Sequence, residues 1–262
     1  MTSKKAVCVI TGASRGLGES IALNFAPKFS DGSVIILMAR NKSALDNVLH
    51  RVQEKAPTVC VIAKEYDQGS LDNELFSSIL SNALEEAGVQ PADFEQALLV
   101  NNAGSIEPLV YIRNLLGVNE ISKYFNSNVA GMIALTSTFV KIFPATLGVD
   151  RLVINISSLA AVQPLKSLSL YCAGKAARDM FFKVLAAEEE NIRVLNYAPG
   201  PLVTDMADAI INTAEDDDLR HSMGDAKARN NLLTCDMSVQ KLLQVLEKDT
   251  FQNGSHLDYY DV

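Results

Sequence analysis

The chain has 262 residues, of which 48% are apolar and 21% charged, so it is long enough and apolar enough to bury a substantial core. Its formal net charge of −8 argues against nucleic acid or an anionic membrane surface as the main partner, because both require a basic face. We expect a single α/β domain over residues 1–262 that binds no nucleic acid and no membrane.

The cysteines and histidines form no motif for a metal or a disulfide. Cys8, Cys60, Cys172 and Cys235 have no CxxC spacing, and most lie in apolar runs, which is typical of reduced thiols in a cytoplasmic protein. The N-terminal apolar run is interrupted too early for a signal sequence, and no stretch approaches membrane-spanning length. We therefore expect a cytoplasmic protein with no metal site and no histidine base.

Seven short apolar runs rich in β-branched residues predict the strands. They cover residues 6–11, 33–39, 59–65, 97–102, 151–157, 192–198 and 255–259. Helical patterns of crossover length separate them, which predicts a parallel sheet of about seven strands with helices on both faces.

A polar segment late in the chain, residues 212–231, interrupts this alternation. An acidic run of this kind is usually a solvated loop, although a loop of this length can also close over a site. We expect residues 202–231 to form a lid over the substrate.

The first predicted strand runs directly into TGASRGLG, which opens the next helix. Gly12, Gly16 and Gly18 lie in this turn, where missing side chains let backbone amides approach a pyrophosphate at the positive end of the helix. A tight turn without a ligand is the alternative. The position between strand and helix favours dinucleotide binding and a doubly wound Rossmann-type domain.

The end of the second predicted strand indicates which dinucleotide is bound. An NAD site usually has an acidic residue there for the ribose hydroxyls, whereas this chain has Arg40 and Asn41. Arg40 and Arg15, from the glycine turn, are suited to hold a 2′-phosphate, although either alone is also common on a surface. Together they favour NADPH/NADP+ as the cofactor.

Tyr171 and Lys175 lie one helical turn apart in YCAGK, a spacing that is common on any helix surface. Their context is more specific. The segments TGASRGLG, NNAG at 101–104, Asn128 in NSNVAG, ISS at 156–158, YCAGK and PGP at 199–201 resemble, in order and spacing, the short-chain dehydrogenase/reductases over nearly the whole chain.

This resemblance implies an NADP-dependent oxidoreductase whose catalytic residues are Asn128, Ser158, Tyr171 and Lys175, with Ser157 as the less favoured alternative to Ser158. It also implies a set of cofactor-binding residues: Gly12, Ser14, Arg15, Gly16, Leu17, Gly18, Arg40, Asn41, Asp67, Asn102, Ala103, Gly104 and Lys175.

The implied chemistry explains why a phenol stands beside an ammonium. A carbonyl that accepts a hydride develops oxyanion charge and needs a positioned acid. Tyrosine has an ordinary pKa near ~10, and a cation one helical turn away is expected to lower it by stabilising the phenolate. We therefore expect Tyr171 to supply the proton, Lys175 to lower its pKa and hold the nicotinamide ribose, and Ser158 to bind the substrate oxygen.

Three longer strings are similar to the pterin-reducing members of this family: NISSLAAVQPLKSLSLYCAGKAARDMFF, NIRVLNYAPGPLVTDM and VQKLLQVLEKDTFQNGSHLDYYDV. This similarity implies a small-molecule pterin substrate and the reduction of side-chain carbonyls of sepiapterin and 6-pyruvoyl-tetrahydropterin in tetrahydrobiopterin synthesis. The alternatives are a broad carbonyl reductase and a non-catalytic sensor that binds NADPH.

The pterin would be anchored by Asp258, whose carboxylate can accept two parallel hydrogen bonds, with Asp261 as the alternative. The implied substrate-binding residues are Ser158, Leu159, Tyr171, Gly200, Leu202, Met206 and Asp258.

The helical stretches at about 119–143 and 170–187 carry more apolar residues than one core-facing stripe needs. Packing against the sheet accounts for most of them. The family resemblance implies that the rest pair with a second copy in a homodimer.

Overall fold

The computed structural model describes residues 4–70, 72–115, 117–189 and 191–261. Its centre is a seven-stranded sheet of order β3-β2-β1-β4-β5-β6-β7, in which each neighbouring pair is parallel. The strands are β1 Ala6–Thr11, β2 Val34–Ala39, β3 Cys60–Glu65, β4 Gln96–Asn101, β5 Asp150–Ile156, β6 Ile192–Ala198 and β7 His256–Asp258. The predicted fold class is confirmed, and every predicted strand is present.

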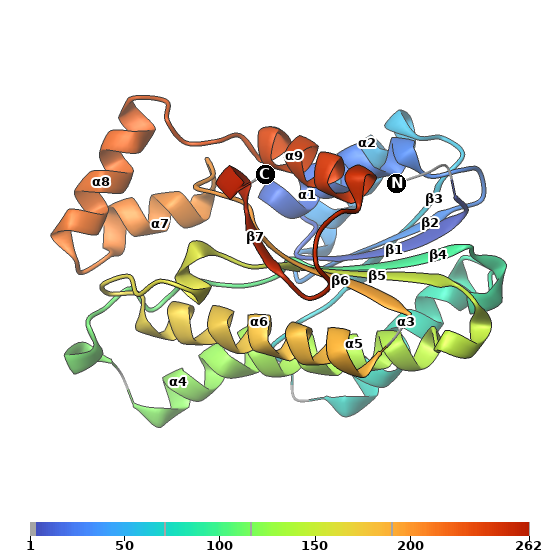
Figure 1. Ribbon diagram of the computed structural model, residues 1–262, viewed down its shortest axis with the longest axis horizontal. Coiled ribbons are helices and arrows are strands. Elements are labelled where there is room, and N and C mark those ends of the chain that lie inside the picture. Colours follow the sequence, from blue (N-terminus) through green and yellow to red (C-terminus); the bar gives the residue numbers. More distant parts are fainter. Residues whose placement is uncertain (1–3, 71, 116, 190, 262) are drawn as a thin grey trace.

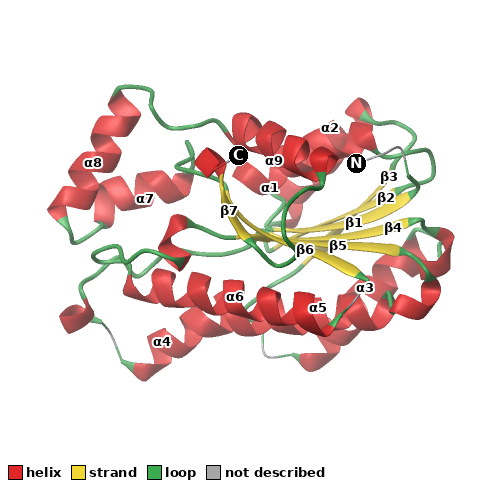
Figure 2. Ribbon diagram, viewed as in Figure 1, coloured by secondary structure: helices red, strands yellow, loops and turns green. Residues whose placement is uncertain are grey.

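Helices cover both faces of this sheet (Figures 1 and 2). One face packs against α1 Gly16–Phe25, α2 Lys42–Lys55 and α9 Cys235–Lys248. The other packs against α3 Asn73–Glu86, α5 Gly131–Ile142 and α6 Ser169–Glu188. Because the sheet is apolar on both faces, its strands read as continuous hydrophobic runs, which is why their positions could be predicted.

The strand order reverses between β1 and β4, since the chain crosses from β3 at one edge back to the middle of the sheet. In doubly wound sheets, ligands bind in the crevice that this reversal opens at the carboxyl ends of the strands. The fold therefore directs attention to the residues after β1 and β4.

A long helical segment runs along one face: α4 Val118–Phe125, a π-helical turn Asn126–Ala130 and α5. The segment Val118–Leu147, which holds these elements and a short turn after them, is long and apolar enough to span a membrane by length and composition, contrary to the prediction. Met132, Leu135 and Phe139 in it are fully buried against the sheet, as expected of a core helix.

The polar segment predicted as a loop is instead largely helical. α7 Asp205–Thr213 and α8 Asp217–Ala228 project beyond the carboxyl ends of the strands (Figure 1). Asp216 caps α8 by accepting a hydrogen bond from the Leu219 amide at 2.9 Å. The acidic run therefore begins a helix, because carboxylates are favourable at a helix N-terminus. We call α7, α8 and their connection the lid.

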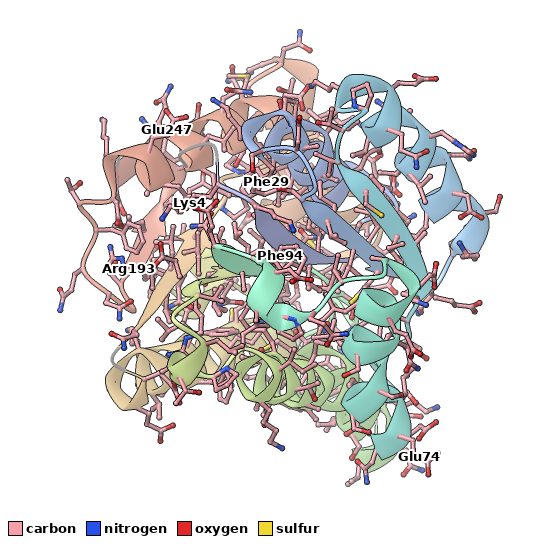
Figure 3. All side chains as sticks on the ribbon, turned by 90° about the vertical axis from the view of Figure 1, so that its right-hand side faces the viewer. Lys4, Phe29, Glu74, Phe94, Arg193 and Glu247 are labelled. Carbon is pink, nitrogen blue, oxygen red and sulfur yellow. The ribbon has the colours of Figure 1, made fainter. Side chains whose placement is uncertain are left out.

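The opposite end of the molecule is the amino edge of the sheet. Figure 3 looks onto this edge, where Lys4, Phe94 and Arg193 are labelled. Lys4 forms an ion pair with Asp150, and Arg193 pairs with Asp249 at 2.6 Å. These ion pairs are exposed and lie away from the predicted site. The predicted catalytic and cofactor-binding residues lie at the carboxyl edge of the sheet.

Candidate active site

The glycine turn after β1 has no space for side chains at two of its glycines. A Cβ added at Gly18 would lie 2.3 Å from the Gly12 carbonyl oxygen, and one added at Gly12 would lie 2.9 Å from Nδ2 of Asn102. Gly12 and Gly16 also have positive φ, at 66° and 58°. Side chains are therefore excluded from this turn, and within the described residues no side chain caps the start of α1. Free amides at a helix N-terminus suit a pyrophosphate.

The NNAG turn after β4 is fastened to this glycine turn. The Thr11 hydroxyl accepts hydrogen bonds from the amides of Asn102 at 3.1 Å and Ala103 at 3.0 Å. In return, the Asn102 side chain donates to the Thr11 carbonyl at 2.9 Å and the Gly12 carbonyl at 3.2 Å. The two turns at the switch point thus form one rigid unit, and Gly104 lies next to Asn128.

The residues that are predicted to hold the adenosine part of the cofactor lie along the same carboxyl edge of the sheet. Arg40 is exposed at the end of β2, and the amide oxygen of Asn41 caps α2 by accepting from the Ala44 amide at 3.0 Å. Asp67 is exposed after β3 and accepts from the Gly69 amide at 2.9 Å. Arg15 is exposed and pairs with Asp205 of the lid at 2.7 Å. Ser14 and Leu17 complete the glycine turn and the first turn of α1.

Tyr171 lies on α6 beneath the lid and is 8% exposed. Its hydroxyl lies 3.9 Å from the sulfur of Met206 in the first turn of α7. Burial raises the pKa of Tyr171, while the nearby Ser158 hydroxyl and then Arg178 lower it. The side chain of Ser157 is instead directed at Asp179, to which it donates at 2.6 Å. The geometry therefore favours Ser158 over Ser157 as the partner of Tyr171.

Lys175 lies on the same inner face of α6 as Tyr171 and is buried. Its Nζ donates to the Ile156 carbonyl at 2.6 Å and lies 5.6 Å from the centre of the Tyr171 ring. Burial, followed by the charge of Arg178, holds the pKa of Lys175 well below its usual range. That Lys175 lowers the pKa of Tyr171 stays a prediction. The ammonium is turned toward a carbonyl, and Arg178 also contributes to lowering the pKa of Tyr171.

Asn128 is 4% exposed and lies in the π-helical turn. Its side-chain oxygen accepts from the Ser105 amide at 2.7 Å, and its nitrogen donates to the Ser105 hydroxyl and the Tyr124 carbonyl, both at 3.0 Å. A π-helical turn widens the helix locally and is frequent at functional sites. Asn128 thereby connects Ser105, which follows the NNAG turn, to its own helical segment.

The predicted substrate side lies between α6, the lid and the end of β7. Leu159 follows Ser158 and is 42% exposed. Gly200 has φ of 76° and its backbone lies against Tyr259 and Leu233, while Leu202 bridges to Leu233. Asp258 pairs in register with Ala198 and accepts from the Tyr260 amide at 3.1 Å.

The lid closes over Tyr171 through an apolar cluster. Ile210 and Ala214 of the lid pack with Tyr171, Ile106 and Leu168. Such packing excludes water from a site, which strengthens every electrostatic interaction inside it. Among the described residues, no group of three or more histidine, cysteine or acidic side chains is arranged to hold a metal.

Arg178 and the residues around it were missed by the sequence reasoning. Asp179 accepts from Asn155 at 3.1 Å and from Ser157 at 2.6 Å, and its second oxygen contacts Nδ1 of His256 at 2.6 Å. A signal was present, since the charged residues at 178 and 179 fall on the helix face that also carries the apolar Leu170, Phe182 and Leu185.

Comparison with known proteins finds relatives over nearly the whole chain. The short chain dehydrogenase family matches residues 6–215. The sepiapterin reductase of Meriones unguiculatus is 42% identical over 259 residues, which are 98% of this chain and 97% of that protein. The benzil reductase ((S)-benzoin forming) of Bacillus subtilis (strain 168) is 28% identical over 256 residues, covering 95% and 96%. The crystal structure of the KRED1-Pglu enzyme matches with a TM-score of 0.80 at 24% identity, covering 96% and 100%, and shows the shared fold.

The geometry predicts different outcomes for the two residues of the YCAGK pair. Tyr171→Phe should keep the dinucleotide affinity and lose most turnover of a carbonyl substrate, because only the proton donor is removed. Lys175→Met should lose both, yet unfold at the same or a higher urea concentration, because it removes a buried charge. Cofactor titration, steady-state kinetics and urea unfolding measure this. Near-normal turnover of Tyr171→Phe would contradict its role as the donor.

Proposed function

The chain belongs to the short-chain dehydrogenase/reductase family, and from that premise we propose that this oxidoreductase reduces the side-chain carbonyls of pterins such as sepiapterin with NADPH. The observation that carries the proposal is Tyr171, buried beneath the lid and next to the half-buried Ser158 at the carboxyl edge of the sheet, in a chain 42% identical to a sepiapterin reductase. The expected products belong to the synthesis of tetrahydrobiopterin.

The cofactor is a nicotinamide dinucleotide. It fits the glycine turn, because this turn excludes side chains and no side chain caps the start of α1. The choice of NADPH is supported by Arg40, which is exposed at the end of β2, where an NAD site usually has an acid. Arg15 is a second candidate ligand for the 2′-phosphate. To bind the phosphate it would leave Asp205, its exposed ion-pair partner.

The bound cofactor supplies a hydride to the carbonyl carbon. Tyr171 gives a proton to the oxygen, which becomes the product hydroxyl, and Ser158 donates a hydrogen bond to that oxygen before transfer. Lys175, directed along the end of β5, would hold the nicotinamide ribose, and Asn128 keeps the neighbouring Ser105 segment in place. The lid excludes water while these groups act.

The pterin ring would be read by Asp258 at the end of β7. One of its oxygens accepts from the Tyr260 amide, which fixes the carboxylate without using all its acceptor capacity. Asp261 accepts from the Asp258 amide at 3.1 Å and so supports this turn.

A second candidate function is a broad reductase of non-pterin carbonyls, a class favoured by the apolar cluster around Tyr171 and by the similarity to a benzil reductase. The value of kcat/KM for sepiapterin, compared with that for a simple diketone, separates the two functions. A non-catalytic sensor is less consistent with this chain, because the chain retains the three predicted catalytic residues Ser158, Tyr171 and Lys175.

The proposal extends to a homodimer in the cytoplasm. The outer face of α6 exposes a stripe of small and apolar residues, with Met180 59% and Val184 45% exposed. Ala173, Ala176 and Ala177 lie on the same exposed face. A second copy would cover this stripe by helix pairing. The four cysteines are free, which supports a reducing compartment.

For cofactor choice, Arg40→Asp should weaken NADPH binding by about tenfold or more while leaving NADH unchanged or improved, because only NADPH carries the 2′-phosphate. Dissociation constants from the fluorescence of each reduced cofactor measure this. Equal losses for both would remove Arg40 from the phosphate site.

For the substrate, Asp258→Ala should lower kcat/KM for sepiapterin about 5-fold to 150-fold, corresponding to about 1 to 3 kcal/mol for unpaired ring donors. A small diketone, which lacks those donors, should be nearly unaffected on the same preparation, and NADPH affinity should hold. A parallel fall for both substrates would assign Asp258 to the fold, and unchanged sepiapterin kinetics would place the anchor elsewhere.

For the assembly, sedimentation should find a dimer that Met180→Glu converts to a monomer, because a charge would be buried in the paired stripe. Met237→Glu is the matched control, since Met237 is 49% exposed on α9 on the other face of the sheet. A monomeric wild-type protein at all concentrations would refute the dimer.

A further inference from the structure

β7 is a strand of three residues that carries Asp258, the proposed anchor of the pterin. It lies at the edge of the sheet and pairs with β6 over His256–Asp258. A short edge strand has few backbone hydrogen bonds to hold it in place. The position of Asp258 therefore depends on side-chain contacts that β7 makes with other elements.

The alternation of the strand places His256 and Asp258 on one face of the sheet, since successive side chains point to opposite faces. Leu257 packs into the apolar cluster that contains residues of α9, so the other two side chains lie on the face that α6 covers. His256 reaches α6, where its Nδ1 lies 2.6 Å from Oδ2 of Asp179. These two side chains are only 12% and 5% exposed. A buried contact thus joins β7 to the catalytic helix.

The carboxylate of Asp179 is fixed by the sheet. Its Oδ1 accepts hydrogen bonds from the Ser157 hydroxyl at 2.6 Å and from the Asn155 side chain at 3.1 Å. Asn155 also donates to the side-chain oxygen of Asn196 in β6 at 2.9 Å. Asn196 in turn donates to the Gly254 carbonyl at 3.1 Å, just before β7. One buried network therefore connects α6, β5, β6 and the segment that enters β7.

The imidazole of His256 is held at one of its nitrogens. Because an ionised carboxylate can only accept, the ring donates from Nδ1 to Asp179, while the Ser157 hydroxyl lies farther from Nδ1, at 3.5 Å. Its Nε2 is buried and has no hydrogen-bond partner among the described residues. Such an atom costs folding free energy, which an apolar side chain of similar size would avoid. The contact with Asp179 therefore explains this histidine better than packing does.

The helix α6 is a fixed reference for this contact. Arg178 precedes Asp179 in the helix and is 1% exposed. It donates to the Asn101 carbonyl at 2.6 Å and to the Ala103 carbonyl at 2.9 Å. Both acceptors belong to the NNAG turn, which is predicted to line the cofactor. A strand that is fastened to α6 is thus also placed relative to the cofactor turn.

Tyr171 and Asp258 both take their positions from the contact between Asp179 and His256. Asp179 lies two turns after Tyr171 on the buried face of α6, about 12 Å along the helix axis. Asp258 lies two residues after His256, about 7 Å along the strand. Because α6 crosses back between the parallel strands β5 and β6, both of these lengths lead from the contact to the carboxyl edge of the sheet.

We propose that His256 is a positioning residue for the pterin substrate. Held by Asp179, it fixes β7 against the catalytic helix and so sets the place of Asp258 relative to Tyr171. The inference rests on the proposed pterin function for the use of Asp258. The fastening of β7 to α6 stands on the hydrogen bonds alone.

The test compares three substitutions of His256. His256→Leu removes the contact with Asp179 and fills the space with an apolar side chain. The side-chain nitrogen of asparagine is as many bonds from the backbone as Nδ1 of histidine, so His256→Asn keeps the donor toward Asp179. The nitrogen of glutamine is one bond farther away, as Nε2 is, so His256→Gln loses that donor.

Arg151→Gln is the matched control. Arg151 is also buried, at 2% exposure, and its ion pair with Glu189 at 2.8 Å ties β5 to the far end of α6. It therefore removes a buried contact between the sheet and the same helix, but away from β7.

His256→Leu and His256→Gln should lower kcat/KM for sepiapterin about 10-fold or more, because a misplaced anchor moves the carbonyl away from the reacting groups. A small diketone, which does not use Asp258, should be nearly unaffected, and so should the affinity for NADPH. His256→Asn should recover most of the loss, and Arg151→Gln should show no loss that is selective for sepiapterin. In the Asp258→Ala background, His256→Leu should lower kcat/KM by less than about 2-fold, because the histidine acts through that aspartate.

Three results would overturn the proposal: a parallel fall for both substrates, a loss of the same size with and without Asp258, or a selective loss in Arg151→Gln. If His256→Leu does not fold, the comparison of His256→Gln with His256→Asn decides. A loss that is confined to His256→Gln supports the proposal, and equal values for these two variants overturn it.

Hydrogen exchange separates failure of this inference from failure of the pterin function, because it needs no substrate. The backbone amides of residues 255–261 should exchange about 10-fold faster in His256→Leu than in the wild type or His256→Asn, while those of β4 stay unchanged. Unchanged exchange at 255–261 in His256→Leu overturns the fastening. A wild-type protein that does not reduce sepiapterin refutes the proposed function, and the exchange result then decides the fastening by itself.

Discussion

The hydrogen bonds between Thr11 and the NNAG turn hold together the place where the sheet reverses its strand order. A dinucleotide binds in the crevice between the two halves of a doubly wound sheet, so the width of that crevice has to be fixed. Thr11 and Asn102 exchange hydrogen bonds across that crevice, and the glycines around them keep it clear of side chains. Arg178 extends the same unit to α6, so that cofactor turn and catalytic helix move together.

The lid adds the second constraint. Glu215 and Asp216 connect its turn to Tyr111, whose amide donates to Glu215 and whose hydroxyl donates to Asp216, both at 2.7 Å. The hydrogen bond from the Tyr111 hydroxyl lowers the pKa of Asp216. These polar contacts hold the outer end of the lid, while Met206 and Ile210 hold its inner end on the apolar cluster around Tyr171. The acidic run therefore fixes the lid as well as beginning a helix.

The strands and glycine turn could be predicted from the sequence because their signals are local: buried parallel strands are continuous apolar runs, and a glycine turn stands between strand and helix. The helical state of the lid was missed because its polar composition resembles a loop, and only the capping by Asp216 favours a helix. The partners of Lys175 and Arg178 were not predictable, since helical spacing gives a common face and not the acceptor that each side chain reaches.

The two buried cations of α6 oppose the folding of the chain that carries them. Lys175 and Arg178 are desolvated in a core where apolar side chains of similar size would be tolerated or preferred. A laboratory selection that scores only resistance to heat would therefore accumulate substitutions at these positions and return well-folded, inactive proteins. Engineering of this fold for thermostability has to screen for turnover at every round, or confine its changes to the amino edge and the outer helix faces.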